Sequence, residues 1–197
     1  MEVQKDLVLL TLLGPRNLLN KASELRVDRI IPTSGVPTNG GGSIIQIVQE
    51  TKTDTASSSA GNVWTDMGLS ASITPKFDTS KILVMIQANI GSSAGFDMKC
   101  RLMRGSTAIH IGDAASSRPQ ASVSITANYS TTANYNSNQT IINYLDSPST
   151  TSTTTYKIQF ASYSSYVCYI NRAGSDLDTA EYDARTASSI ILMEVSG

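Results

Sequence analysis

The sequence predicts an all-β fold, specifically a jelly-roll-like antiparallel β-sandwich that follows a short helical or extended N-terminal anchoring segment. From residue 43 to residue 197, strand-like apolar runs succeed one another, turns rich in Ser, Thr, Asn and Gly separate them, and no stretch of helical periodicity intervenes. Many short strands at fairly even spacing are typical of a sandwich or a closed barrel. We therefore divide the chain into a segment over 1–42 and a β-sandwich head domain over 43–197.

The N-terminal segment contains the only candidate helical region, residues 1–31. Its leucines recur at mixed three- and four-residue spacings, and Gly14-Pro15 interrupts them, because proline breaks a helix. So short an apolar stretch cannot bury its side chains alone. Either it packs beneath its own β-domain or it serves attachment and oligomerisation, and we predict the second. The anchoring residues would be Leu7, Leu10, Leu13, Leu18 and Leu19. The Pro- and Gly-rich residues 32–42 form a linker.

Ten strands are expected in the head domain. Their ranges are 43–51, 63–69, 81–90, 96–102, 107–111, 123–129, 140–145, 156–161, 166–170 and 188–195. Strict alternation of apolar and polar residues marks the strand at 81–90 as half-buried. Residues 54–60 are expected to be a polar turn, and residues 172–187 a polar loop.

The first and last of these strands, 43–51 and 188–195, are apolar on both faces. A strand of a two-layer sandwich that is buried on both sides needs a cover from elsewhere, which is often another subunit. In a jelly roll the two strands would be neighbours, and together they would line one subunit interface. We therefore predict a homotrimer.

Composition narrows the classes of partner. Only 16% of the residues are charged, against about 25% in an average protein, and Ser and Thr fill 49 positions. The net charge of −1 offers no basic face for phosphates, so we expect no nucleic-acid partner. The apolar run Leu7–Leu13 is too short for a bilayer, which takes about 20 residues. Nor does its surrounding resemble a signal peptide, so we expect no membrane insertion.

No arrangement of residues predicts an enzyme, a metal site or a cofactor. The single histidine, His110, lies in a short strand, and there is no G-x-S-x-G motif for a nucleophile. One histidine and two distant cysteines do not make a zinc site. Cys100 and Cys168 each sit in an alternating apolar run. They are expected to be buried and reduced, and a disulfide stays open if their strands are neighbours.

The polar loop near the C-terminal end carries an acidic cluster. Its carboxylates belong to Asp176, Asp178, Glu181 and Asp183. They could offer oxygen ligands to calcium, although the spacing is not that of an EF-hand. The alternative, which we favour, is pairing with Arg172 and Arg185, which bracket the cluster.

A tyrosine-rich stretch precedes that loop. Tyr163 and Tyr166, with Asn171 nearby, suit stacking and hydrogen bonding to a sugar. Packing of the aromatic rings across strands is the other interpretation.

Six stretches of the sequence carry a likeness to a known family, and together they cover most of 23–197. They are 23–37, 40–49, 66–75, 80–84, 169–176 and 185–194. They resemble small tail-fibre-like virion proteins of bacteriophages, especially phages of cyanobacteria and other aquatic bacteria. These stretches are typical of the structural framework of a protein and do not form a catalytic motif. The resemblance implies a structural virion protein, a trimer with a β-sandwich head, while the first 22 residues fall outside it.

We accordingly expect a short trimeric tail fibre or appendage, attached to other virion proteins through its N-terminal segment. It would be assembled in the host cytoplasm and released with the virion by lysis. Two alternatives are a trimeric decoration or cement protein of the capsid, and a receptor-recognition module that binds host surface glycans. An enzyme such as a polysaccharide depolymerase is the weakest reading, since it would require an acidic cleft.

Overall fold

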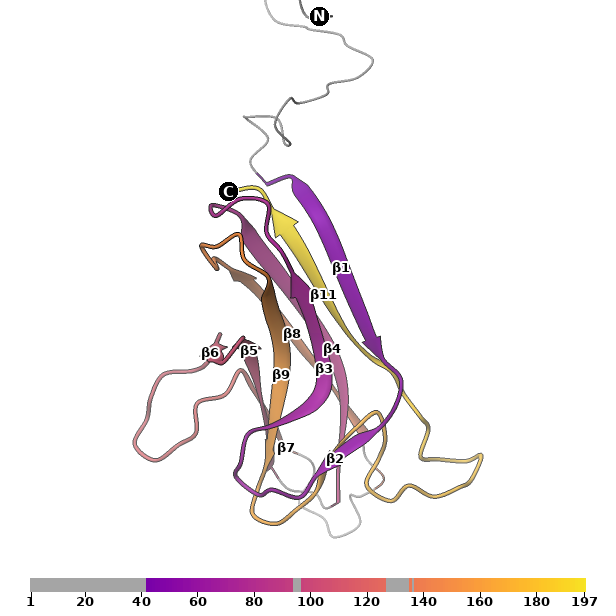
Figure 1. Cartoon of the computed structure of the whole chain (residues 1–197). Helices are drawn as coiled ribbons and strands as arrows, with labels where there is room; N and C mark the ends of the chain where they lie inside the picture. Colours follow the sequence, from indigo (N-terminus) through magenta and orange to yellow (C-terminus); the bar gives the residue numbers. More distant parts are fainter. Residues whose placement is uncertain (1–41, 94–96, 127–134, 136) are drawn as a thin grey trace, which may run out of the picture. The chain divides into compact units, whose positions relative to one another are not determined.

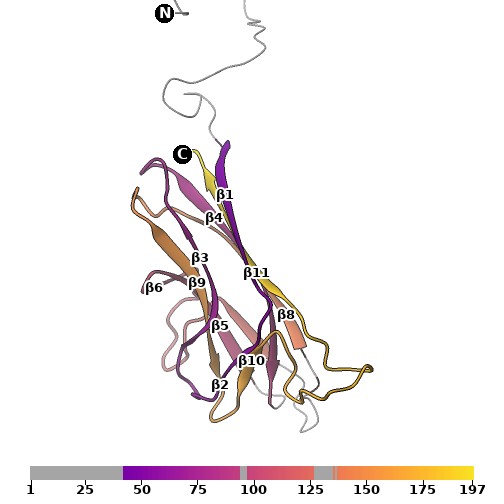
Figure 2. The ribbon, with the colours of Figure 1, turned by 45° about the vertical axis from the view of Figure 1, so that its right-hand side comes forward.

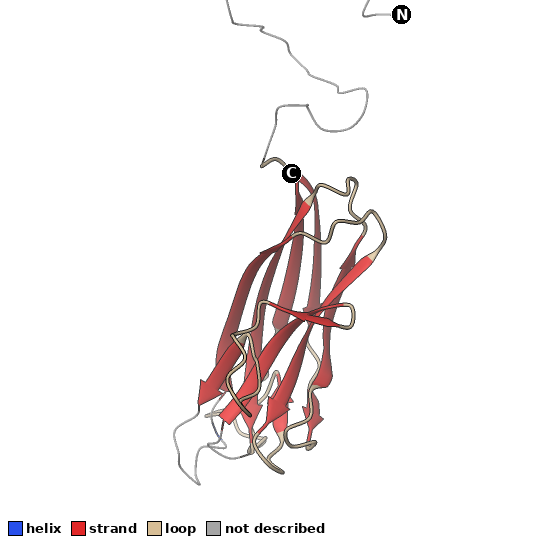
Figure 3. Cartoon of the chain, turned by 90° about the vertical axis from the view of Figure 1, so that its left-hand side faces the viewer, coloured by secondary structure: helices blue, strands red, loops and turns tan. Residues whose placement is uncertain are grey.

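The computed structural model describes residues 42–93, 97–126, 135 and 137–197, and the predicted anchoring leucines lie outside this range. The described residues form eleven strands joined by turns and loops, as the strand and loop colours of Figure 3 show. They contain no helix that is long and apolar enough to cross a membrane. The all-β class predicted from the sequence is confirmed.

The strands follow the alternating stretches of the sequence closely. Their bounds are β1 Ile44–Lys52, β2 Ala56–Ser58, β3 Thr65–Ile73, β4 Lys81–Ser92, β5 Asp97–Arg104, β6 Thr107–Ile109, β7 Val123–Thr126, β8 Ser137–Asp146, β9 Thr154–Ser162, β10 Cys168–Ile170 and β11 Ser188–Val195. The last range is identical to the predicted one.

The strands form two antiparallel sheets that pack face to face (Figures 1 and 2). In sheet A, β4 pairs β8 on one side, and on the other side it pairs first β11 and then β10. β1 borders β11, and β2 borders β10. In sheet B the order is β3-β9-β5, with β6 and β7 both on the far side of β5.

The topology is that of a jelly roll. When β1 with β2, β6 with β7, and β10 with β11 are each counted as one interrupted strand, two four-stranded layers result. Numbered along the chain, these eight strands run in the order 1-8-3-6 in sheet A and 2-7-4-5 in sheet B. The first and last strands are therefore neighbours, as the sequence predicted, and this order is the double Greek key of the jelly roll.

The core lies between the sheets and is built by alternation along each strand. Ile82, Val84, Ile86, Ala88 and Ile90 of β4 share the inner face and are at most 1% exposed. Large side chains of sheet B oppose them, among them Phe160 and Leu102. Each such side chain contributes about 1.5–3 kcal/mol when fully buried.

Two buried carboxylates also belong to the interior. Asp146, at the end of β8, accepts two hydrogen bonds from the Arg104 guanidinium at 2.9 and 3.0 Å, and one from the Tyr156 hydroxyl at 2.7 Å. It thereby links sheet A to sheet B. Glu194 of β11 is fully buried and accepts hydrogen bonds from the Gln46 amide and the Lys76 backbone N–H. Both carboxylates thus have the partners that burial of a charge requires.

One expectation about the strands is wrong: residues 56–58, predicted as part of a turn, form β2 because their backbone pairs with β10. The outer face of β1 is uncovered in the single chain, where Ile44 and Ile47 are 56% and 57% exposed. β1 is an edge strand, and no described element covers this face. Its cover by another subunit stays a prediction.

Candidate binding surfaces

The domain has two different poles. At one pole the backbone N–H of Gly42 donates to the Ser196 carbonyl, and that of Ser196 donates to the Ser43 carbonyl. The described chain therefore enters and leaves the domain side by side (Figure 1). At the opposite pole lie the turn between β2 and β3, the turn between β9 and β10, and the long loop over 171–187.

Two turns at this second pole are packed against each other at the level of the backbone. The Asn62 N–H donates to the Ser162 carbonyl at 2.8 Å. A Cβ atom at Gly61 would lie 1.1 Å from the carbonyl oxygen of Ser164, so only glycine fits there. This close approach fixes the turn that carries Tyr163 and Tyr166.

Tyr163 and Tyr166 stack on each other, with ring centroids 6.3 Å apart and ring planes 18° apart. Tyr163 is half-exposed, so one face of this pair is open to solvent. Beside it, the Arg172 guanidinium lies 3.8 Å from the centroid of the Tyr169 ring. The two tyrosines predicted to contact a glycan are therefore together at the surface, and their glycan role stays a prediction.

Asn171 has a different place from the one that a glycan contact needs. It is fully buried, and its φ of 65° lies in the left-handed region, which asparagine tolerates better than most residues. Its amide donates to the carbonyls of Lys52 and Asp54, and its oxygen accepts from the Ser188 hydroxyl. Asn171 thus ties the start of the long loop to the end of β1, and a ligand at the surface cannot reach it.

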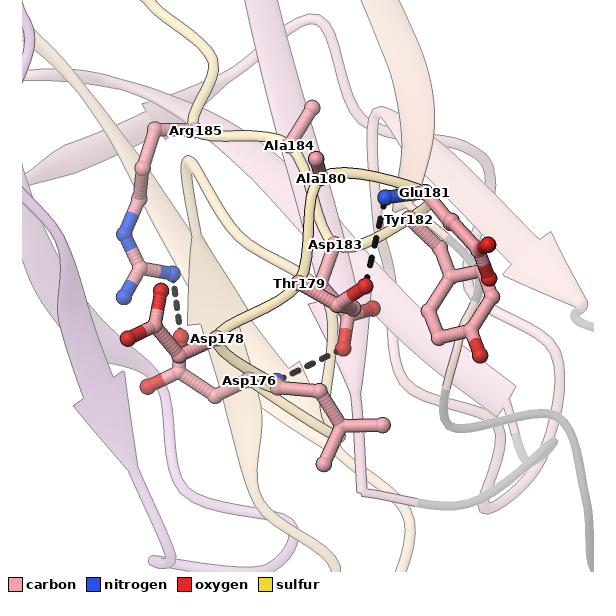
Figure 4. Close-up of a pocket in the computed structure, with 10 residues that line it drawn as sticks. Asp176, Asp178, Thr179, Ala180, Glu181, Tyr182, Asp183, Ala184 and Arg185 are labelled. Atoms are coloured by element: carbon pink, nitrogen blue, oxygen red, sulfur yellow. Dashed lines mark hydrogen bonds and ion pairs between the residues drawn. The ribbon is translucent and has the colours of Figure 1, made fainter.

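The acidic loop forms a polar hollow of about 390 Å³, lined by residues 176–185 (Figure 4). Asp176 is paired with both Arg172 and Arg185. The hydrogen bond from Arg185 and the two positive charges hold the pKa of the Asp176 carboxyl below its usual value. This is the arginine pairing that the sequence favoured over calcium.

The other side of the hollow is ordered by Asp183, whose Oδ2 accepts from the Ser175 hydroxyl at 2.6 Å and from the Leu177 N–H at 2.7 Å. Across the described residues, no group of three or more His, Cys, Asp or Glu side chains is placed to hold a metal ion. Asp176 and Asp183 thus have partners near or within the loop.

The remaining residues singled out in the sequence, His110 and the two cysteines, pack against other side chains of the domain. His110 stacks on Tyr144, with ring centroids 4.8 Å apart. Cys100 and Cys168 are free thiols, both buried, and burial raises the pKa of each. A raised pKa keeps a thiol protonated and unreactive.

The outer face of sheet A is a surface that sequence reasoning found only in part. A row of apolar side chains crosses all four long strands, because Ile47 is opposite Met193, Met193 opposite Leu83, and Leu83 opposite Leu145. Ile47 and Leu145 are 57% and 46% exposed. The predicted two-faced character of 43–51 and 188–195 pointed to half of this row. The contributions of β4 and β8 required the register.

Beside this row the face is slightly hollowed. A shallow depression of about 290 Å³ is lined by Met85 and Gln87 of β4, Ile141 and Asn143 of β8, and residues 189 and 191 of β11. Ile141 is 57% exposed. We refer to the outward side chains of β1, β11, β4 and β8 as the outer face of sheet A.

The comparisons with known proteins identify no family. No family model matches the chain, and no curated protein matches it. Among solved structures, the chain is similar to one described as "Structure of infectious bursal disease virus Gx strain", with 13% sequence identity and a TM-score of 0.38. The match covers 85% of this chain and 42% of that one, so the chain spans less than half the length of the structure it matches.

Proposed function

We propose that the protein is a structural component of a bacteriophage virion, a short trimeric tail fibre or appendage. Its N-terminal segment attaches it to other virion proteins, and its jelly-roll domain faces outward. The single observation that carries this proposal is the polarity of the domain. Gly42, to which the N-terminal segment is joined along the chain, lies at one pole, and the longest described loop, 171–187, lies at the other.

This polarity suits a protein that is fixed at one end and exposed at the other. Residues 1–41 precede Gly42, which is hydrogen-bonded to Ser196 at the first pole. The second pole, one domain length away, carries the 171–187 loop and the stacked tyrosines. Loops on a rigid scaffold are where proteins generally place their contacts with partners.

The resemblance to small tail-fibre-like proteins supports the proposal from the sequence. Three of the resembling stretches, 40–49, 80–84 and 185–194, supply β1, the start of β4 and β11. These strands are consecutive in sheet A. The stretch 66–75 covers most of β3 in sheet B, so the likeness includes strands of both sheets, as expected when shared residues maintain the framework of the sandwich.

A second role, recognition of host surface glycans, is favoured by one observation. The exposed pair of Tyr163 and Tyr166 stands at the pole that would face the host, on a turn fixed by Gly61. Rings of this kind bind the apolar face of a sugar. A capsid decoration protein would use the same trimeric sandwich, and the location of the chain on the particle distinguishes it from a fibre.

We propose no hydrolytic role. Two carboxylates of the loop are engaged, Asp176 with arginines and Asp183 with a hydroxyl and a backbone N–H. Consistent with this, His110→Ala and Asp178→Ala should leave particle function unchanged. Degradation of host capsule by the purified protein, lost in either variant, would contradict the proposal.

The attachment is tested by charging the N-terminal segment. Leu10→Asp with Leu19→Asp should give a protein that folds and assembles normally but is absent from purified particles. Burial of each leucine is worth about 1.5–3 kcal/mol, and three copies multiply the loss. The matched control is Asn17→Asp with Asn20→Asp, which adds the same charge at polar positions of the segment and should incorporate normally. Normal incorporation of the leucine variant would place the docking surface on the β-domain.

A further inference from the structure

We propose that the outer face of sheet A is the surface through which copies of this chain associate. It would pack against the same sheet of neighbouring copies around an axis that runs along the strands. The inference deepens the proposed function, since it assigns the subunit interface of the trimer to named residues.

The face is apolar where a monomer's surface would be polar. Outward positions of the four strands carry Ile44 and Ile47, Leu83 and Met85, Ile141 and Leu145, and Ile191, Met193 and Val195. Four of these side chains are between 46% and 57% exposed. A continuous exposed apolar patch across a whole sheet is typical of an interaction site.

The dimensions match a specific interface. Strands about 4.8 Å apart that rise about 3.4 Å per residue give a four-stranded face of roughly 20 by 27 Å over eight residues. Side chains make the accessible surface of such a face larger than its projected area of roughly 500 Å². A specific interface takes about 800 Å² of accessible surface from each partner. One such face is therefore of the size that a copy contributes to one subunit contact, and in a trimer it is divided between the two neighbours.

The charge on the face favours an identical partner. Among the outward positions of these strands, the only ionisable side chain is Lys81, at one end of β4. Two copies that share this face therefore bring no like charges together at its centre. The polar residues in it are amides and hydroxyls, such as Gln49, Gln87 and Asn143, which can both donate and accept hydrogen bonds.

The edge of sheet A at β1 also supports association through this face. β1 is a nine-residue edge strand that has neither proline nor an inward-pointing charge along its apolar half, residues 44–48. An exposed, long, apolar edge strand is an aggregation site unless something covers it. A neighbouring copy seated on the outer face would bury Ile44 and Ile47 and shield this edge.

The arrangement also agrees with the poles. The strands of sheet A run between the two poles, so an axis parallel to them leaves the first pole of every copy at the same end. Gly42 of every copy, to which the N-terminal segment is joined along the chain, would then lie at the same end of the assembly. Packing of the sheets in the opposite direction would place these residues at opposite ends.

The test is the mass of the full-length protein in solution by light scattering at micromolar concentration. The wild type should contain three copies. Ile47→Asp with Leu145→Asp, which charges both ends of the apolar row, should give a single copy with an unchanged β-sheet circular dichroism spectrum. The control, Ser70→Asp with Ser72→Asp, adds the same charges on exposed positions of sheet B and should still contain three copies.

A milder pair keeps the test valid if the charged variant fails to fold. Ile47→Ser with Leu145→Ser should raise the dissociation constant by roughly a hundredfold or more. A monomeric wild type overturns the proposal, and so does a trimer that the face variants leave intact. A trimer that Leu10→Asp with Leu19→Asp dissociates while the face variants leave it intact would also overturn the proposal, because the N-terminal segment would then hold the copies together. Loss of particle incorporation with an intact trimer would bear on attachment alone.

Discussion

The outer faces of the two sheets share the same strand geometry but differ in the side chains that they carry. On sheet B, the outward side chains are polar and satisfy one another: Asp66 binds Lys157 and Gln159, and Arg101 binds Gln159 while it covers Trp64. On sheet A, the outward row of Ile47, Met193, Leu83 and Leu145 has no such partners in the described domain.

One sandwich can thus have one outer face whose polar side chains are paired with each other, and another whose apolar side chains are left uncovered. A face with internally paired polar groups gains little from a further layer, because its groups already have partners. A face of branched aliphatic side chains gains roughly 25 cal/mol for each Å² that a partner covers.

The largest effect separates the inner from the outer side of one strand. Leu192 of β11 is fully buried, and its neighbour Met193 points outward. Measured by urea unfolding in the monomeric Ile47→Asp, Leu145→Asp background, Leu192→Ala should cost about 2–5 kcal/mol. Met193→Ala should change stability by less than about 0.5 kcal/mol. In the wild-type background, however, Met193→Ala should weaken association. Equal losses of stability at both positions would show that the outer face is already covered within one chain.

Many strand positions and their buried faces could be predicted from the sequence, because the alternation of apolar and polar residues along a strand is a local pattern. The strand 188–195 and the inner face of β4 follow directly from the pattern of their own residues. What covers the outer side of β1 depends on a partner, so the pattern could not distinguish burial in the chain from burial in an assembly.

Other features depend on contacts that are far apart in the sequence. β2 has only Ala and Ser, and it is a strand solely because β10 pairs with it. Asn171 was predicted to be a surface residue in contact with a glycan. Its burial follows from carbonyls more than 110 residues away, at Lys52 and Asp54. Contacts between residues so far apart in the sequence cannot be predicted from the periodicity of apolar residues.

The second largest effect concerns the carboxylate that joins the two sheets. Asp146→Ala removes the acceptor of the Tyr156 hydroxyl and the partner of Arg104. A buried hydroxyl left without a partner costs about 1–3 kcal/mol, and thermal unfolding should show this loss. Asp146→Asn, which keeps an acceptor oxygen, should lose less. If both variants lose the same amount, the charge of Asp146 and not its hydrogen bond to Tyr156 is what stabilises the fold.

A smaller effect depends on pH and involves the inner side of sheet A. Burial alone raises the pKa of the Glu194 carboxyl, but hydrogen bonds from Gln46 and the Lys76 N–H outweigh it and hold the pKa below the usual 4.5. Because the pKa is lower in the folded state, the stabilisation is fully present above pH 4.5 and is lost as the pH falls through the folded-state value.

The measurement is the difference in Tm between the wild type and Glu194→Gln from pH 7 down to pH 3. The wild type should be the more stable at pH 7, and the difference should shrink below pH 4.5. Using the difference cancels the titration of the other carboxylates. A constant difference across this range would mean that Glu194 does not titrate in the way its hydrogen bonds imply.

The smallest effect tests the outer face of sheet B, whose polar side chains are paired. Asp66 is about half exposed, and its carboxylate lies 2.6 Å from the Lys157 ammonium and 2.8 Å from the Gln159 amide. Burial opposes the charge, but these hydrogen bonds and the positive charge of Lys157 hold the pKa of Asp66 below its usual value. Because exposed ion pairs are worth about 0.2–1 kcal/mol, Asp66→Ala should lose less than about 1 kcal/mol, and the loss should fall further in high salt. Light scattering should still find three copies, since nothing on this face holds a partner. A dissociated Asp66→Ala protein would mean that sheet B, and not sheet A, carries the subunit interface.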